Sequence, residues 1–167
     1  MNRLDTERLE LLPFTEGDAD FVFRLLNEPS FLRYIGDRGV HDLESARRYI
    51  EDGPVASYAR HGHGLMRVVR RADGEALGMC GVLKRDTLPD VDIGFSFFPA
   101  FWSQGYALES AGAVMRQARD VLGVGRILAI TSQDNEPSMR LLGKLGFRFD
   151  KMVTMGTEEL RLFVSEP

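Results

Sequence analysis

The chain has 167 residues, of which 44% are hydrophobic and 28% are charged, and its formal net charge is −4 at pH 7. This composition is typical of a soluble globular protein, so we expect a single domain over residues 1–167. No apolar run approaches the roughly 20 residues of a membrane span, and the acidic balance without a Lys/Arg cluster argues against nucleic acid as a partner. The polar start of the chain is unlike a secretory signal, and the single cysteine, Cys80, fits a reducing compartment, so we expect a cytoplasmic protein.

The first third of the chain predicts one strand and two helices. The strand covers Leu9 to Phe14, and a helix follows that Asp18 can cap. The segment from Phe31 to Gly39 is expected to be an aromatic connector. A second helix is expected from Asp42 to a stop at Gly53-Pro54.

The middle of the chain predicts three strands and a long helix. The strands are expected at Leu65–Arg70, Ala76–Leu83 and Val91–Phe97, and the short turns between them imply antiparallel neighbours. Apolar residues at helical spacing, Val121 among them, predict a helix from Ala107 to Leu122.

The last third predicts a strand, a helix and a hairpin. Arg126–Thr131 reads as a buried strand, and the strand–helix–strand order makes it parallel to the strand that ends at Phe97. A helix from Glu136 to Lys144 ends at Gly146, and a hairpin turns through 155–157. We therefore expect a mixed sheet covered by helices.

The segment from Phe97 to Ala107 joins the third middle strand to the long helix. A turn of small residues that opens onto a helix leaves backbone N–H groups unpaired, and the helix dipole adds about half a positive charge there. Gly105 and Ala107 let an anion approach the backbone closely. The segment therefore predicts a site for a phosphate or pyrophosphate.

Residues 102–107 read Trp-Ser-Gln-Gly-Tyr-Ala and resemble the Gln/Arg-x-x-Gly-x-Gly/Ala loop of the GNAT N-acetyltransferases. Trp102 replaces the first polar residue, as in the branch of ribosomal-protein N-terminal (Rim-type) acetyltransferases. The segment from Asn135 through Ser138 to Phe147 resembles that family's Asn-x-x-Ser and Lys-x-Gly-Phe elements. The resemblance implies the GNAT fold: an α+β (mixed α/β) domain whose central, mostly antiparallel sheet has about seven strands, with helices on both faces.

The resemblance also implies where coenzyme A binds. The pantetheine arm and acetyl carbonyl would contact the strand backbone, the pyrophosphate would bind the loop, and Asn135 would bond the pantetheine arm from the far side. The implied cofactor-binding residues are Phe95, Ser96, Phe97, Ser103, Gln104, Gly105, Tyr106, Ala107, Leu108, Asn135 and Ser138. Gln104 stands where relatives often carry a cation, so Arg140 and Lys144 are candidates to supply the positive charge.

Two candidates for proton transfer follow from the same resemblance. Leu142 occupies the position of the tyrosine acid of many relatives, so Ser138 becomes the candidate proton donor to the thiol, against a purely helix-capping role. Asp92 matches an acidic residue of the Rim-type branch and is the candidate base, against a solvated surface residue. Water could also remove the amine proton.

The residues around the acceptor amine are less defined by the sequence. The connector and the segment before the second strand offer a candidate substrate-binding set: Tyr34, Asp37, Arg38, His41 and Tyr58. His61 and His63 could suggest a metal, but no third ligand is nearby and a solvated glycine loop explains them, so we expect no metal.

These observations predict an acetyl-CoA-dependent N-acetyltransferase that acts through a direct ternary complex. One alternative is a non-catalytic acyl-CoA-binding module, which the missing tyrosine would explain. A dinucleotide-binding domain is the other, but Gly-x-Gly-x-x-Gly after the first strand is absent. The acceptor stays open between a protein N-terminus and a small amine, the net charge favours a cationic one, and a homodimer is possible.

Overall fold

One eight-stranded sheet forms the centre of the structure, a computed structural model that describes residues 2–167. Its strands run in the order β1-β2-β3-β4-β5-β6-β8-β7, and every neighbouring pair is antiparallel except β5 and β6, which are parallel. The strands are β1 (Leu4–Asp5), β2 (Leu9–Pro13), β3 (Met66–Arg70), β4 (Ala76–Leu83), β5 (Asp92–Phe97), β6 (Ile127–Thr131), β7 (Arg148–Met155) and β8 (Glu158–Ser165). The predicted mixed, mostly antiparallel sheet is confirmed, and the extra strand is the two-residue β1.

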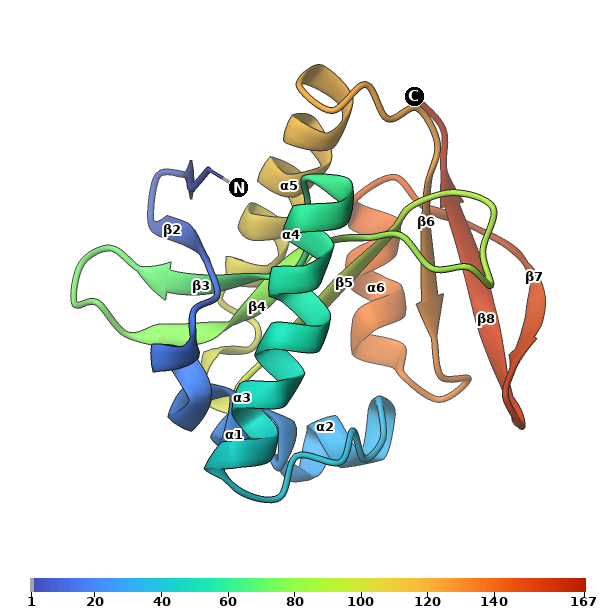
Figure 1. Ribbon diagram of the computed structural model, residues 1–167. Coiled ribbons are helices and arrows are strands. Elements are labelled where there is room, and N and C mark those ends of the chain that lie inside the picture. The colour runs from blue at the N-terminus through green and yellow to red at the C-terminus, as the bar shows by residue number, and fades with distance from the viewer. Residues whose placement is uncertain (1) are drawn as a thin grey trace.

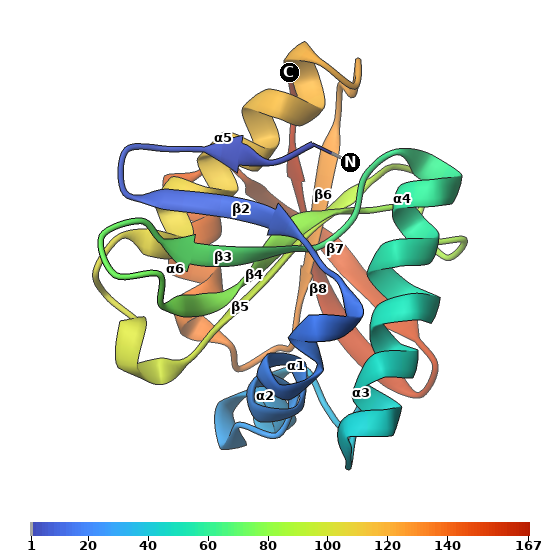
Figure 2. The same cartoon turned by 60° about the vertical axis from the view of Figure 1, so that its left-hand side comes forward.

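Helices cover both faces of this sheet, as predicted. Figures 1 and 2 show α5 and α6 on one face and the N-terminal helices on the other. The helices are α1 (Ala19–Leu26), α2 (Pro29–Tyr34), α3 (Leu43–Ile50), α4 (Ala56–His61), α5 (Tyr106–Asp120) and α6 (Glu136–Lys144). Short 3₁₀ turns, η1 (Glu16–Asp18) and η3 (Pro99–Phe101), precede α1 and α5.

The expected connector after α1 is in part a helix. Pro29 occupies the first turn of α2, where its missing N–H leaves no hydrogen bond unmade. Phe31 is buried in the core on the α1–α3 side of the sheet and anchors the helix. The aromatic residues of this segment are therefore packed helix residues, and the irregular connector begins only after Tyr34.

The expected stop at Gly53-Pro54 is wrong. A π-helical segment, η2 (Glu51–Val55), joins α3 to α4 without interruption, and the Ala56 amide donates to the carbonyl of Glu51, five residues back. This widened turn accommodates a proline that cannot donate a backbone hydrogen bond. The helical stretch ends instead at Gly62, whose φ of 75° is left-handed.

His63, expected in a solvated loop, is only 7% exposed. One ring nitrogen, Nδ1, lies 2.8 Å from the carbonyl oxygen of Val82, and the ring stacks on His61 at a centroid distance of 5.7 Å. Residues 2–167 hold no group of three or more His, Cys, Asp or Glu placed to bind a metal ion.

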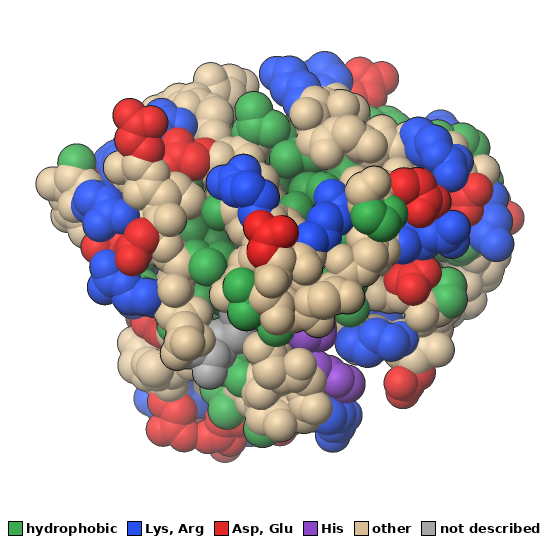
Figure 3. Space-filling view, turned by 90° about the horizontal axis from the view of Figure 1, so that it is seen from above, with side chains coloured by type: hydrophobic (Ala, Val, Ile, Leu, Met, Phe, Trp, Pro, Cys, Tyr) green, Lys and Arg blue, Asp and Glu red, His purple; other side chains and the backbone are tan. Residues whose placement is uncertain are grey.

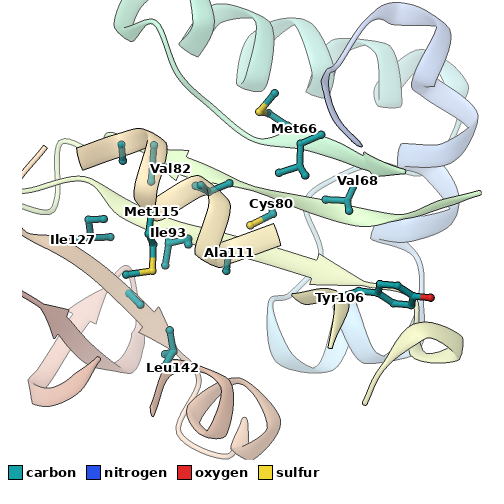
Figure 4. Close-up of a cluster of buried hydrophobic side chains, with 14 of the residues drawn as sticks. Met66, Val68, Cys80, Val82, Ile93, Tyr106, Ala111, Met115, Ile127 and Leu142 are labelled. Atoms are coloured by element: carbon teal, nitrogen blue, oxygen red, sulfur yellow. The ribbon is translucent and has the colours of Figure 1, made fainter. Parts of the chain in front are cut away.

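The core on the α5 side contains the single cysteine. Figure 4 shows Ala111 and Met115 of α5 directed toward Cys80 and Ile93 of the underlying strands. Burial raises the pKa of the Cys80 thiol to about 12, so this side chain is a packed core group and not a nucleophile. Val121, predicted on the buried face, is 73% exposed because α5 ends one residue before it.

The surface at the C-terminal end of α5 carries mixed charge. Basic and acidic side chains are interspersed across the face that Figure 3 shows. Within residues 2–167, none of the helices combines the length and the apolar character needed to cross a bilayer.

Candidate functional site

The parallel strands β5 and β6 separate soon after they meet. Their one register pair is Asp92 with Leu128, next to a hydrogen bond from the Leu128 amide to the Val91 carbonyl at 2.9 Å. From Ile93 onward, the edge of β5 that faces β6 has no strand partner in the described part of the chain. The sheet therefore presents unpaired backbone groups at its centre, which is where an extended ligand can add to a strand edge.

The direction of the β5 backbone groups follows from the two hydrogen bonds at its ends. The Val91 carbonyl bonds to β6, whereas the Phe98 amide bonds to the Leu77 carbonyl of β4 at 3.0 Å. Because these groups alternate along a strand, the amides of Phe95 and Phe97 face the gap and that of Ser96 faces β4. Two of the three backbones predicted to hold the acyl chain thus face the gap.

The loop after β5 is fastened to the end of this strand. The Trp102 indole Nε1 donates to the Phe97 carbonyl at 2.9 Å. This bond explains an indole at the first position of the loop motif, since it satisfies a carbonyl that no strand pairs. The following residues, Ser103 and Gly105, have positive φ values of 61° and 83°.

The turn at Gly105 leads directly into α5. The first hydrogen bond of the helix runs from the Glu109 amide to the Gly105 carbonyl at 3.0 Å, so the amides of residues 106 to 108 have no partner within the helix. Together with the dipole of a fifteen-residue helix, these amides are the backbone donors on which the predicted anion site depends. Gln104 is turned away from this site, and its Nε2 bonds to the Ala100 carbonyl at 3.0 Å.

A brace supports this loop; it consists of Thr6 and Arg8, in the turn between β1 and β2, and Glu109 of α5. Arg8 donates from Nη1 to the Gln104 carbonyl at 3.1 Å and lies over the Tyr106 ring at 4.4 Å. Glu109 accepts from Arg8 Nε at 2.7 Å, from the Arg8 amide at 2.9 Å and from the Thr6 hydroxyl at 2.5 Å. Burial alone would raise the pKa of the Glu109 carboxyl, but these hydrogen bonds outweigh it and hold that pKa below its usual value.

We expect Glu109→Ala to lower the free energy of unfolding by about 2 kcal/mol, because three hydrogen bonds to a charged group are lost. The KM for acetyl-CoA should rise several-fold, since Arg8 is then free to leave the loop. Because the pKa of Glu109 is lowered in the folded protein, this stabilisation is fully present above about pH 4. It is lost as the pH falls through the folded-state pKa of Glu109. Urea denaturation and steady-state kinetics measure the two effects.

Glu44→Ala is the matched control for this change. Glu44 pairs with Arg48 one helical turn away on an exposed surface, so its loss should cost less than about 0.5 kcal/mol. Equal effects of the two substitutions on stability and KM would show that the brace does not support the loop.

A cavity of about 340 Å³ lies between the loop, the gap-facing side of β5 and the first turns of α6. Ten of the eleven predicted cofactor-binding residues line it, all except Gln104: Phe95, Ser96, Phe97, Ser103, Gly105, Tyr106, Ala107, Leu108, Asn135 and Ser138. The proposed cations Arg140 and Lys144 line it as well. The cavity therefore combines a strand edge, the N-terminal turn of α5 and two positive side chains.

A second cavity, of about 130 Å³, adjoins the first. The two share four lining residues: Tyr34, Phe95, Asn135 and Ser138. Arg33 holds α2 at this junction, because its guanidinium lies 3.5 Å from the Asp134 carboxylate and 4.7 Å from the centre of the Tyr34 ring. Figure 1 shows α2 beside the loop between β6 and α6. The two cavities thus meet at the point where β5 and β6 separate.

The junction carries the hydroxyl group of Ser138. Asn135 caps α6, and its Oδ1 accepts the Ser138 amide at 3.3 Å, while no protein group in residues 2–167 bonds the Ser138 hydroxyl. Helix capping is therefore the task of the Asn135 side chain. Leu142 lies one turn further along α6, is fully buried and lines the second cavity, so it supplies no proton there.

Asp92 is buried, contrary to its interpretation as a solvated residue. Its side chain is 1% exposed, and both carboxylate oxygens accept from Arg85 Nε, at 3.0 and 3.1 Å. Burial raises the pKa of Asp92, and the adjacent guanidinium opposes that rise. Both residues line the second cavity.

The predicted acceptor set divides into two groups. Tyr34 and Arg38 line the second cavity, whereas Asp37, His41 and Tyr58 line neither cavity. Asp37 and His41 form an exposed pair at 3.5 Å. The Tyr58 hydroxyl donates to the Leu65 carbonyl and accepts the Phe14 amide at 3.0 Å, and burial raises its pKa to about 12, so its role is to tie α4 to the sheet.

Four polar residues of the second cavity were missed at the level of sequence: Arg85, Thr131, Ser132 and Glu158. A signal existed for two of them. Thr131 and Ser132 follow the C-terminal end of a parallel strand, which is where ligands bind when adjacent strands separate. Arg85 lies in the loop between β4 and β5 and Glu158 at the start of β8, far apart in the sequence, and neither carries a comparable signal.

Comparison with known proteins gives a consistent result. Residues 8–148 match the model of the acetyltransferase (GNAT) domain. An uncharacterized N-acetyltransferase of Bacillus subtilis, YoaA, is 30% identical over 149 residues, which are 87% of this chain and 82% of that protein.

Solved structures share the fold at lower identity. An acetyltransferase from Agrobacterium tumefaciens superposes with a TM-score of 0.85 at 23% identity, covering 100% of this chain and 95% of that one. RimL, a ribosomal L7/L12 alpha-N-protein acetyltransferase in complex with coenzyme A, gives a TM-score of 0.83 at 15% identity, covering 99% of this chain and 98% of that one.

Proposed function

The chain belongs to the GNAT acetyltransferase family and is an acetyl-CoA-dependent N-acetyltransferase, and we propose that the acetyl group passes directly to a primary amine in a ternary complex. The observation that carries this proposal is the meeting of two cavities at Tyr34, Phe95, Asn135 and Ser138. The coenzyme occupies the larger cavity and the amine enters from the smaller one. No covalent carrier is needed, and the thiol of Cys80 is sealed in the core.

The larger cavity supports this placement of the coenzyme. Its pyrophosphate binds the amides that follow Gly105, and Arg140 and Lys144 supply the positive charge that Gln104 lacks. The pantetheine arm extends along the open edge of β5, and Asn135 bonds it from α6. No metal takes part in this scheme.

The chemistry takes place at the junction. The Phe95 amide donates to the acetyl oxygen and stabilises the negative charge that develops there as the amine nitrogen attacks the carbonyl carbon. As the carbon–sulfur bond breaks, the Ser138 hydroxyl donates a hydrogen bond to the departing thiolate. Asp92, on the acceptor side, takes the proton that the amine loses through water, because it lies further along β5 from the junction.

The acceptor is a protein N-terminus or a small-molecule amine. The cytoplasmic location, the single domain over residues 1–167 and a homodimer stay predictions from the sequence.

Release of free thiol from acetyl-CoA in the presence of an amine panel tests the proposal. We expect turnover, and Ser138→Ala should lower kcat about tenfold with little change in the KM for acetyl-CoA, since one hydrogen bond to the leaving group is lost. Stability should be unchanged, because the Asn135 cap accepts a backbone amide that the substitution keeps. Tight coenzyme binding without turnover on any amine would favour the non-catalytic alternative.

A further inference from the structure

The second cavity contains polar groups that the protein itself does not satisfy. The Thr131 hydroxyl and the Ser132 hydroxyl are buried without a hydrogen-bond partner in residues 2–167, and Thr131 is only 6% exposed. Both residues line the cavity at the end of β6. A buried hydroxyl without a partner is unfavourable, so its presence here points to a polar ligand that completes its hydrogen bonds.

Two guanidinium groups line the same cavity with unused donors. Arg85 uses only its Nε on the Asp92 carboxylate, which leaves its terminal nitrogens without a protein acceptor in the described chain. Arg38 forms no hydrogen bond or ion pair with any group of residues 2–167. Guanidinium groups with free donors match the oxygens of an acidic group.

The charges of the cavity are balanced but not all paired. Arg85 neutralises Asp92, which leaves the cation of Arg38 and the carboxylate of Glu158 as the free charges of the lining. Glu158, at the start of β8, forms no ion pair within the described residues. A ligand with one positive and one negative group complements this arrangement, whereas the net charge of the whole chain had favoured a purely cationic acceptor.

The size of the cavity limits that ligand. Its volume of about 130 Å³ accommodates a molecule of the size of a small amino acid. Asp92, which binds the Arg85 guanidinium, is three residues from Phe95 along β5, a rise of about 10 Å. The long arginine side chains span part of this distance. An amine at the junction and an acidic group on the arginines are therefore separated by a few bonds.

We propose that the acceptor is a small amino acid, whose amine lies at the junction beside Phe95 and Ser138 and whose carboxylate binds Arg38 and the terminal nitrogens of Arg85. This inference rests on the proposed function for the position of the amine. The Thr131 and Ser132 hydroxyls complete their hydrogen bonds on the same ligand. In a protein N-terminus the α-carboxylate is replaced by an amide that continues into the chain, so this site disfavours it.

The test compares amines with and without a carboxylate on the coenzyme A complex of the full chain. Calorimetry would measure binding of α-, β- and γ-amino acids, of their decarboxylated amines and amides, of phosphoethanolamine and of a short peptide with a free N-terminus. We expect at least about tenfold tighter binding of one amino-acid chain length than of its decarboxylated amine, and the same order in acetyl transfer from acetyl-CoA.

Two variants assign the effect to the proposed residues. Arg38→Gln should abolish the preference for the carboxylate, while Arg47→Gln, the same change at an exposed arginine of α3 that lines neither cavity, should leave it intact. Thr131→Val should weaken amino-acid binding but raise the melting temperature of the ligand-free protein, because it removes a buried hydroxyl without a partner.

Equal binding of amino acids and their decarboxylated amines would overturn the inference, as would tightest binding of the peptide or of phosphoethanolamine. Selective binding of an amino acid without acetyl transfer would support the ligand assignment and contradict the proposed function. Acetylation of amines without regard to a carboxylate would support the proposed function and contradict the assignment of an amino acid as the acceptor.

Discussion

Replacing Gly105 by valine should weaken coenzyme A binding about 100-fold while the protein stays folded. Gly105 has a φ of 83°, where a β-branched side chain is strained by about 1–3 kcal/mol, and its Cβ would lie 3.2 Å from Nη2 of Arg8. Relief of that strain turns the amides of residues 106 to 108 away from their common focus and displaces the arginine of the brace. The pyrophosphate then loses several donors at once, each worth about 1.5 kcal/mol or more to a charged acceptor.

Gly74→Val separates this effect from backbone strain alone. Gly74, in the turn between β3 and β4, has a φ of 71° and open space around its Cβ position. Both variants should lose similar amounts of unfolding free energy in urea, but only the Gly105 variant should lose affinity for coenzyme A in calorimetry. Unchanged affinity of the Gly105 variant would mean that the loop does not bind the pyrophosphate.

The fold was predictable because its signals are local. Apolar spacing predicted α5, and Gly105 and Gly146 have positive φ values next to α5 and α6, where the sequence placed a turn and a helix end. The predictions of the fold were wrong where tertiary packing overrode a local sequence rule. Pro54 reads as a helix stop, yet burial of its ring and the widened turn of η2 keep the helix continuous.

The coenzyme side and the acceptor side of the proposed site also differ in how far a local sequence pattern predicts them. The coenzyme side is built largely from the contiguous segment 95–108, so one sequence motif could predict nearly all of it. The acceptor side joins Arg38, Arg85, Thr131 and Glu158 from four separate segments. Asp92 shows the consequence: nothing in its neighbours reveals that it is buried and paired with the partly exposed Arg85, since that pairing depends on the loop between β4 and β5.

The backbone of β5 allows a direct test of how the acetyl oxygen is stabilised. Phe95→Pro should lower kcat about 100-fold relative to Phe95→Ala, because proline removes the amide that faces the gap and alanine keeps it. The loss corresponds to about 3 kcal/mol of transition-state stabilisation. Proline is tolerable at this position because the Phe95 amide forms no ladder bond with β4, so the sheet keeps its pairing.

Ser96→Pro provides the opposite case on the next residue. The Ser96 amide faces β4, so proline there removes a ladder bond in the middle of the sheet and should destabilise the protein by about 3 kcal/mol or more. Thermal unfolding distinguishes the two proline variants, and steady-state kinetics compares Phe95→Pro with Phe95→Ala. If kcat is the same for proline and alanine at position 95, the oxyanion is stabilised elsewhere, and the amide of Phe97 becomes the next donor to test because it faces the same gap.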